Sequence, residues 1–281
     1  MSAWIAGVKL AIGDYIGFVD GDDWVNDNMY ESMVYTAKQY KAEIVTCAFL
    51  KDYGTYVEEV PVFIEEGIYY GEKLYKQLYT MLINVGYGNY RGIGASRCNK
   101  LIKRELLINN LKYCDCRISY GEDLNITVPV ALDAKRIYVM KNSFFYHYRQ
   151  NPSSITNSPS YKEKFWETCL VLNDNLRRVV KEKGYEKLLK QLDMDLVYMA
   201  WTSLLNECRN NDHISNIYRN MKQITNNDHV KRGFLYLNYK KMPLKEKIVL
   251  RLIKSKRVSL LYFIYKTTNH SILRKRGKLT G

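Results

Sequence analysis

Three aspartates stand close together in this chain of 281 residues, and their spacing could hold a metal ion. Asp20, Asp22 and Asp23 come directly after an apolar run at residues 15–19. Carboxylates this close repel one another unless a cation or strong hydrogen-bond donors offset their charge. Oxygen ligands without a neighbouring Cys or His favour magnesium or manganese over zinc. We therefore expect a divalent metal site at this turn.

Other interpretations of the acidic turn differ in how well they fit. An EF-hand loop would need Asp or Asn at its fifth position and Gly at its sixth, but Trp24 and Val25 stand there, which excludes it. A haloacid dehalogenase phosphatase also has an Asp-x-Asp after a buried strand, but continues with a small hydroxyl or β-branched residue where Trp24 lies. The plainest alternative is an acidic turn in which Asn26 or Asp27 caps the next helix. That alternative stays open.

A second acidic pair, Glu122 and Asp123, precedes an apolar run of helical length at residues 124–134. Carboxylates in the first turn of a helix are stabilised by the helix dipole, and this is the structural interpretation. The functional interpretation is a general base, because a carboxylate in a cleft can take a proton from an attacking hydroxyl group. Both interpretations stay open on these residues alone.

The elements around these carboxylates predict an α/β sheet. Residues 15–19 read as a strand buried on both faces, which would place Asp20 at its carboxyl end, where ligands bind in open parallel sheets. Alternation in the segment 51–71 predicts a hairpin or meander. The remaining expected elements of this part are helices at about 3–12, 28–40 and 72–84, a strand at 43–49, and a helix entered by residues 98–107.

Further along, strands are expected at about 136–140 and 143–149, followed by a turn at 151–156. His147 in the second strand is more typical of a packed histidine than of a ligand. The Arg149 guanidinium could pair with a phosphate or a carboxylate. The glycines at 85–96 match no phosphate-binding fingerprint and indicate a mobile loop.

Composition limits the function classes. An excess of 43 Lys and Arg over 29 acidic residues gives a net charge of +14, which calls for an anionic partner or surface. Six scattered cysteines indicate reduced thiols in a cytosolic protein. No apolar run approaches the length of about 18 residues that a membrane span needs, and no signal peptide is evident.

The composition changes after about residue 158 to long helices, expected at 161–183 and 185–209. The stretch 245–278 mixes apolar residues with Lys and Arg, which fits an amphipathic basic segment lying on an anionic membrane. A solvated helix packed on the domain is the alternative. We expect two domains, 1–157 and 158–281.

Taken together, five segments resemble the bacterial family 2 glycosyltransferases of the GT-A fold, in that family's order and spacing over residues 5–157. The resemblance rests on GVKLAIGDYIGFVDGDDWV, NKLIKRELL, ISYGEDLN, YHYRQNPSSIT and the basic helical tail. It implies an inverting enzyme of surface polysaccharide synthesis that transfers a sugar from a nucleotide-sugar, by family habit a UDP-sugar. The acceptor would be a hydroxyl group of a polysaccharide or lipid-linked glycan.

The resemblance also implies roles for individual residues. Asp20 and Asp22 would hold Mn²⁺ or Mg²⁺ on the donor diphosphate, with His147 facing the metal or phosphates. Asp123, in a motif with Glu122, would be the base that deprotonates the acceptor. The donor-binding residues would be Asp23, Trp24, Asn99, Lys100 and Arg149. The protein would be cytoplasmic and peripheral on the inner face of the membrane.

One departure from the family is also informative. Members normally open with a strand-helix-strand-helix-strand half that holds the nucleotide base, and this sequence begins in the helix before the Asp20 strand. We therefore expect an incomplete GT-A (Rossmann-like) sheet with an exposed edge, followed by a mostly α-helical C-terminal region. The alternative function is a non-catalytic remnant that binds a membrane or a partner. Nucleic-acid binding has no recognised motif to support it.

Overall fold

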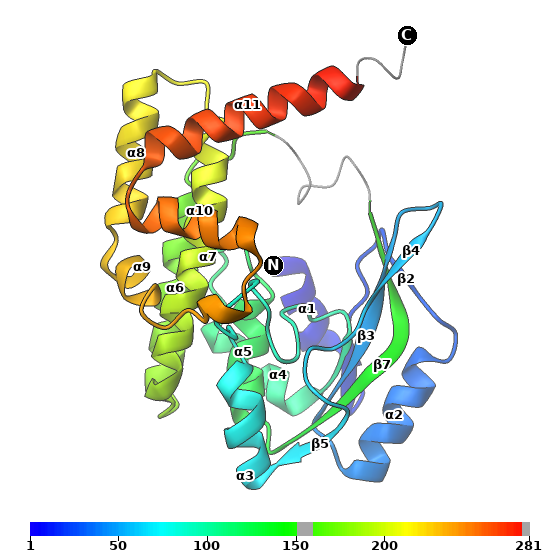
Figure 1. Cartoon of the computed structure of the whole chain (residues 1–281). Coiled ribbons are helices and arrows are strands. Elements are labelled where there is room, and N and C mark those ends of the chain that lie inside the picture. Colours follow the sequence, from blue (N-terminus) through cyan, green and yellow to red (C-terminus); the bar gives the residue numbers. More distant parts are fainter. Residues whose placement is uncertain (151–159, 277–281) are drawn as a thin grey trace. The chain divides into compact units, whose positions relative to one another are not determined.

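The computed structural model describes residues 1–150 and 160–276 (Figure 1). The predicted boundary at 157 and the turn at 151–156 lie outside the described residues. Contacts divide the chain into two compact units. The first comprises Met1–Val85, Tyr90–Ser158 and Thr168–Leu189, and the second comprises Gly86–Asn89, Pro159–Glu167 and Lys190–Gly281.

The first unit is built on a seven-stranded mixed sheet in the order β1-β6-β3-β7-β2, with β4 paired to β3 and β5 paired to β7. Only β3 and β7 pair in parallel, and the other described pairs are antiparallel. The strands are β1 Tyr15–Gly17, β2 Trp24–Val25, β3 Ile44–Asp52, β4 Val57–Val60, β5 Gly67–Tyr70, β6 Lys100–Lys103 and β7 Arg136–Arg149. The prediction of an α/β sheet is confirmed.

The central strand β3 forms because its first half is buried and, apart from Thr46, apolar. Ile44, Val45, Cys47 and Ala48 are at most 1% exposed, as expected for a strand covered on both faces. Helix α2, Met29–Tyr40, covers part of this sheet with Met29, Met33 and Ala37 (Figure 1). The strand and α2 match the predicted segments closely.

The strand at the acidic turn differs from the prediction. β1 has three residues, all partly exposed, and Val19 beyond it is 47% exposed. The expectation of a strand buried on both faces is wrong, because β1 lies at the end of the sheet and pairs only with β6. Gly17 nevertheless matters for packing, since a Cβ there would lie 2.3 Å from the ring of Tyr30 on α2.

Three other predicted elements need correction. The segment 136–149 is one strand, because residues 141–143 form an irregularity in its pairing with β3 and do not break it. The helix expected from residue 98 begins at Arg104, since the apolar pair Leu101 and Ile102 pairs with β1 and β3 as β6. The helix expected over 72–84 is a short turn, α3 Gly71–Lys73, continued by π and 3₁₀ turns to Met81.

The other helices of the first unit are α1 Ser2–Leu10, α4 Arg104–Asn110, α5 Leu124–Asp133 and most of α6 Phe165–Glu182. Helix α5 is apolar and buried along nearly its whole length, as its sequence predicts. The side-chain amide of Asn175 on α6 donates to the carbonyl of Tyr113, 2.8 Å away. This contact ties α6 to the segment that precedes the second acidic pair.

The second unit is helical throughout its described elements, and this confirms the prediction of a mostly helical C-terminal region. Gly233 allows α9 to approach α7, because a Cβ there would lie 2.2 Å from the Asp193 carbonyl oxygen. The helices are α7 Leu189–Glu207, α8 Ile214–Asn226, α9 Asp228–Gly233, α10 Leu244–Lys254 and α11 Val258–Arg276. No described helix is long and apolar enough to cross a membrane.

Candidate active site

The acidic turn is fastened to strand β7. The backbone N–H of Asp20 donates to the Tyr146 hydroxyl, 3.2 Å away, and that hydroxyl donates to Asp23 Oδ2, 2.6 Å away. The backbone N–H of Arg149 donates to Asp23 Oδ1, 2.9 Å away. Burial raises the pKa of Asp23, and the bonds from Tyr146 and Arg149 oppose that rise. Asp23 is thus held by two donors of β7, and it fixes the shape of the turn.

Arg97 brings the two acidic clusters together. Its Nη2 lies 3.1 Å from Asp20 Oδ1, and its Nη1 contacts Asp123 Oδ1 and lies 3.4 Å from Glu122 Oε1. The whole residue is 8% exposed. An arginine fork suits this task because its donors point in fixed directions and its charge persists at every relevant pH. The guanidinium therefore offsets part of the repulsion expected at this turn, through its contact with Asp20.

Aromatic rings surround the same guanidinium. Its carbon lies 5.8 Å from the ring centroid of Trp4 and 5.9 Å from that of Phe18. The two rings themselves meet edge to face, with centroids 6.1 Å apart. Cations are attracted to aromatic faces at such distances, more strongly where water is excluded. Arg97 is consequently held from both the carboxylate side and the apolar side.

Asp123 points toward Arg97 and does not cap its own helix. It stands at the N-cap position of α5, yet its side chain accepts no hydrogen bond from the helix amides. Gly121 permits the preceding turn, since its φ is +70° and a Cβ there would lie 2.7 Å from Leu172 Cδ2. Burial raises the pKa of Asp123, with Arg97 acting in the opposite direction. The geometry leaves a carboxylate that faces the acidic turn, as a general base requires.

Asp22 differs from its neighbours. It is exposed and makes no hydrogen bond or ion pair with any residue in the described ranges. Asp20 is also largely open, with 48% of its side chain exposed. In the same ranges, no three His, Cys, Asp or Glu residues are grouped so as to hold a metal ion. The metal site expected at Asp20, Asp22 and His147 stays a prediction.

Trp24, His147 and Arg149 form a separate cluster beside the turn. The rings of Trp24 and His147 stack with centroids 5.0 Å apart, and the Arg149 guanidinium lies 5.2 Å from the Trp24 ring. This follows from sheet register, because Trp24 on β2 lies opposite His147 on β7. His147 Nε2 is 2.7 Å from Asn26 Oδ1. Trp24 and Arg149 thus offer an aromatic face and a cation at one place.

Asn99 and Lys100 are buried beneath the site. Lys100 is 1% exposed, and its ammonium donates to the carbonyls of Ile93 and Ser96 at 2.8 and 2.6 Å. Asn99 donates to the Cys47 carbonyl, 2.6 Å away. Burial lowers the pKa of Lys100 to about 8. These two residues, predicted to bind the donor, hold the loop that carries Arg97 in this structure.

Sequence reasoning missed Arg97 and Tyr146. A signal for Arg97 was present, since five carboxylates without a nearby cation require one. The arginine lies directly after the glycine-rich stretch 85–96, and no motif marks it. Tyr146 resembled an ordinary core tyrosine in an aromatic strand, and only the pairing of β2 with β7 gives it two partners at the acidic turn.

Comparisons with known proteins agree with this arrangement. Residues 1–109 match the family model described as Glycosyl transferase family 2. The chain is 27% identical over 264 residues to the Bacillus subtilis (strain 168) protein named "Uncharacterized glycosyltransferase EpsJ", covering 90% of this chain and 72% of the relative. It is 24% identical over 204 residues to the "Minor teichoic acid biosynthesis protein GgaB" of the same organism, covering 72% of this chain and 21% of the relative.

The fold has solved counterparts. The crystal structure of S. aureus TarS 1-349 in complex with UDP superposes with a TM-score of 0.55 and 17% identity, over 95% of this chain and 70% of that chain. This likeness is one of fold, and it agrees with the GT-A fold expected from the sequence. The chain is thus similar to the family 2 glycosyltransferases over residues 1–109, and its fold is similar to that of TarS.

Proposed function

We propose that this protein transfers a sugar from a nucleotide-sugar, a UDP-sugar, to a hydroxyl group of a polysaccharide or lipid-linked glycan during surface polysaccharide synthesis, with inversion at the anomeric carbon. The observation that carries the proposal is the meeting of Asp20 and Asp123 on one guanidinium. Support also comes from the names of two relatives, a glycosyltransferase and a teichoic acid biosynthesis protein. TarS, of similar fold, has been crystallised with UDP and with UDP-GlcNAc.

A divalent cation fits part of the expected ligand set. Asp20 and Asp22 are exposed oxygen donors, and Asp22 has no other partner in the described ranges. His147 fits less well, because its Nε2 already contacts Asn26 and its ring stacks on Trp24. We therefore assign Asp20 and Asp22 to Mn²⁺ or Mg²⁺. Such an ion would neutralise the diphosphate leaving group.

In the proposed mechanism the chain's own residues position the donor and move one proton. Trp24 and Arg149 provide a stacking face and a cation for the nucleotide-sugar. The acceptor oxygen attacks the anomeric carbon as the bond from that carbon to the diphosphate oxygen breaks. An oxygen of Asp123 takes the hydroxyl proton, so the carboxylate becomes a carboxylic acid. Attack from the face opposite the leaving group inverts the configuration.

Membrane association is the second part of the proposal. Several large apolar side chains on α10 and α11 are exposed, with Leu244 at 74% and Phe263 at 64%. Lysines and arginines alternate with them along residues 245–257. A surface of this composition suits the interface of an anionic membrane. The site of action would then be the inner, cytoplasmic face of the membrane, where a lipid-linked acceptor is presented.

Two substitutions test the catalytic assignment. Asp22→Asn and Asp123→Asn, made separately, should each abolish Mn²⁺-dependent transfer or hydrolysis of UDP-sugars, measured as UDP release. Asp174→Asn is the matched control, because this exposed aspartate lies on α6. Transfer at the wild-type rate by either site variant would refute its assigned role. An inactive wild-type chain that still floats with vesicles would instead favour the non-catalytic alternative.

A further inference from the structure

A second feature of the first unit lies at the opposite ends of the strands from the carboxylates. β1, β3 and β7 run in one direction, since β3 pairs in parallel with β7 and both β1 and β3 pair antiparallel with β6. Asp20 follows the end of β1, and Arg149 ends β7. Residues at the starts of these strands, Tyr15 in β1, Glu43 directly before β3 and Arg136 in β7, line a hollow of about 380 Å³.

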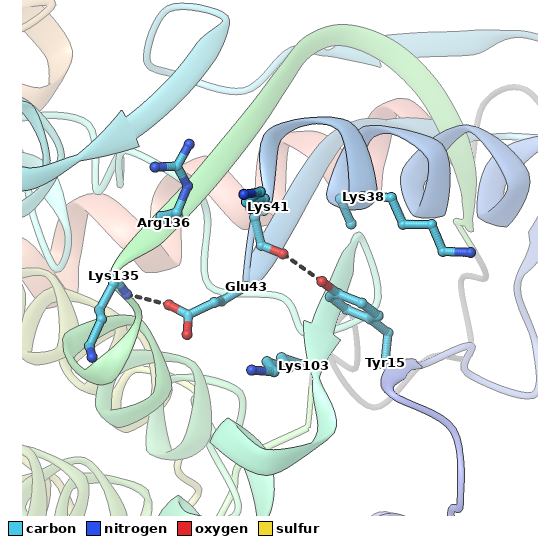
Figure 2. A pocket seen from close by; sticks show the side chains of 9 residues that line it. Tyr15, Lys38, Lys41, Glu43, Lys103, Lys135 and Arg136 are labelled. Atoms are coloured by element: carbon cyan, nitrogen blue, oxygen red, sulfur yellow. Dashed lines mark hydrogen bonds between the residues drawn. The ribbon is translucent and has the colours of Figure 1, made fainter.

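The hollow is strongly basic. Its lining residues are Tyr15, Ala37, Lys38, Lys41, Ala42, Glu43, Lys103, Lys135 and Arg136. Five of these nine carry a positive charge and one carries a negative charge. Figure 2 shows the lysine and arginine side chains around the hollow, and they come from three separate segments of the chain, at residues 38–41, 103 and 135–136. Positive charges this close together repel one another, and a bound anion would reduce that repulsion.

Most of these cations have no protein partner. In the described residues, Lys38, Lys41 and Lys135 form no side-chain hydrogen bond or ion pair. Lys103 Nζ has only an exposed contact with Glu105, at 3.6 Å. The single carboxylate, Glu43, lies among these cations, and its Oε2 accepts the backbone N–H of Lys135 at 2.5 Å (Figure 2).

The neighbouring helix end does not explain the cations either. Carbonyl groups at the C-terminus of a helix attract lysines, and α2 ends here. Three of these carbonyls already have donors, since Arg136 Nε donates to the Tyr40 carbonyl at 2.9 Å, and the backbone N–H groups of Ala42 and Lys41 donate to the Ala37 and Lys38 carbonyls at 2.9 and 3.4 Å. The lysine ammonium groups therefore remain available to a ligand.

We propose that this hollow is an anion site, separate from the carboxylate site, that binds a phosphate-bearing group. Ammonium groups act as point charges for phosphate, and the Tyr15 ring gives one apolar wall. A volume of about 380 Å³ is within the range of small-molecule sites and accommodates one phosphorylated headgroup. The group is either the headgroup of an anionic lipid or a free phosphate compound.

Binding of inorganic phosphate to the full-length protein in metal-free buffer tests the site by calorimetry. The variant Lys41→Gln/Lys135→Gln should bind about tenfold more weakly than wild type, because two of the five charges around the anion are lost. The control Lys9→Gln/Lys181→Gln removes the same charge from exposed positions on α1 and α6, and should bind like wild type. Binding near Arg97 or Arg149 is common to all three proteins and does not affect the comparison.

Flotation with vesicles of phosphatidylcholine, alone or mixed with phosphatidylglycerol, separates the two sources. If the Lys41→Gln/Lys135→Gln variant loses phosphate binding and also floats less than the control on the mixed vesicles, the ligand is a lipid headgroup. A loss of phosphate binding with flotation equal to the control identifies a free phosphate compound. Equal behaviour of the hollow variant and the control in both assays would overturn the proposal. None of these readouts requires sugar transfer, so the result is independent of the proposed enzyme activity.

Discussion

Replacing Arg97 by methionine removes the one group in residues 1–150 and 160–276 that contacts both acidic clusters. Methionine keeps much of the apolar volume beside Trp4 and Phe18 and deletes the charge. The contact with Asp123, whose side chain is 27% exposed, should account for most of the loss. The contacts with Asp20 and Glu122 contribute less, because those side chains are 48% and 35% exposed and water screens them. We expect a total loss of about 3 kcal/mol in the free energy of unfolding.

Urea unfolding followed by circular dichroism measures this loss. The control Arg117→Met removes an exposed pair with Asp115, 2.6 Å long, and should leave the unfolding midpoint close to that of wild type, because water screens the pair. Addition of Mn²⁺ should stabilise Arg97→Met more than wild type, because a bound cation then replaces the missing one and binding adds stability by mass action. An unfolding midpoint unchanged from wild type, or equal stabilisation of both proteins by Mn²⁺, would refute the role given to Arg97.

Three further perturbations test other parts of the structure. Burial lowers the pKa of Lys100 to about 8. Below pH 8 the buried lysine is charged, which lowers the stability of the folded protein. As the pH rises from 8 toward the ordinary pKa of lysine, the folded protein loses this charge and the cost disappears. The stability of wild type relative to Lys100→Met should therefore increase between about pH 8 and 10, and a flat difference in urea midpoints across that range would contradict the burial argument. Gly121→Ala should lower the free energy of unfolding by about 2 kcal/mol, because of the positive φ and the contact with Leu172. Gly7→Ala, in an open helical position, should raise it by about 0.5–1 kcal/mol, as measured in thermal melts. A stability change of the same sign in both variants would contradict the role given to Gly121. Deletion of residues 245–281 should reduce flotation on anionic vesicles, and equal flotation of the full and shortened chains would remove this segment from the membrane proposal.

The sequence predicted the elements whose pattern is local. The continuous apolar run of β3 and the helical periods of α2 and α5 specify these elements almost to their ends. The errors fall where partners decide the structure. Residues 100–103 precede a helix in the sequence, but they form β6, which pairs with β1 and β3. Residues 141–143 shift the register between β7 and β3 without ending the strand.

The candidate site was predictable in its carboxylates and not in the group that joins them. Asp20 and Asp123 stand out because acidic residues border apolar segments, Asp20 after one and Asp123 before one, a pattern visible along the chain. Arg97 lies 77 positions from Asp20 and 26 from Asp123. Its role depends on the path of the loop that Lys100 supports through carbonyl contacts. Tertiary packing sets this long-range geometry, and no local sequence pattern indicates it.

The double contact of Tyr146 has a consequence for protein engineering. One hydroxyl group on β7 serves both Asp20 and Asp23, across a separation of 126 and 123 residues. The acidic turn and β7 are therefore a single exchangeable module. A chimera that imports residues 15–25 from a relative should keep the geometry of the acidic turn only if the strand 136–149 is imported with them.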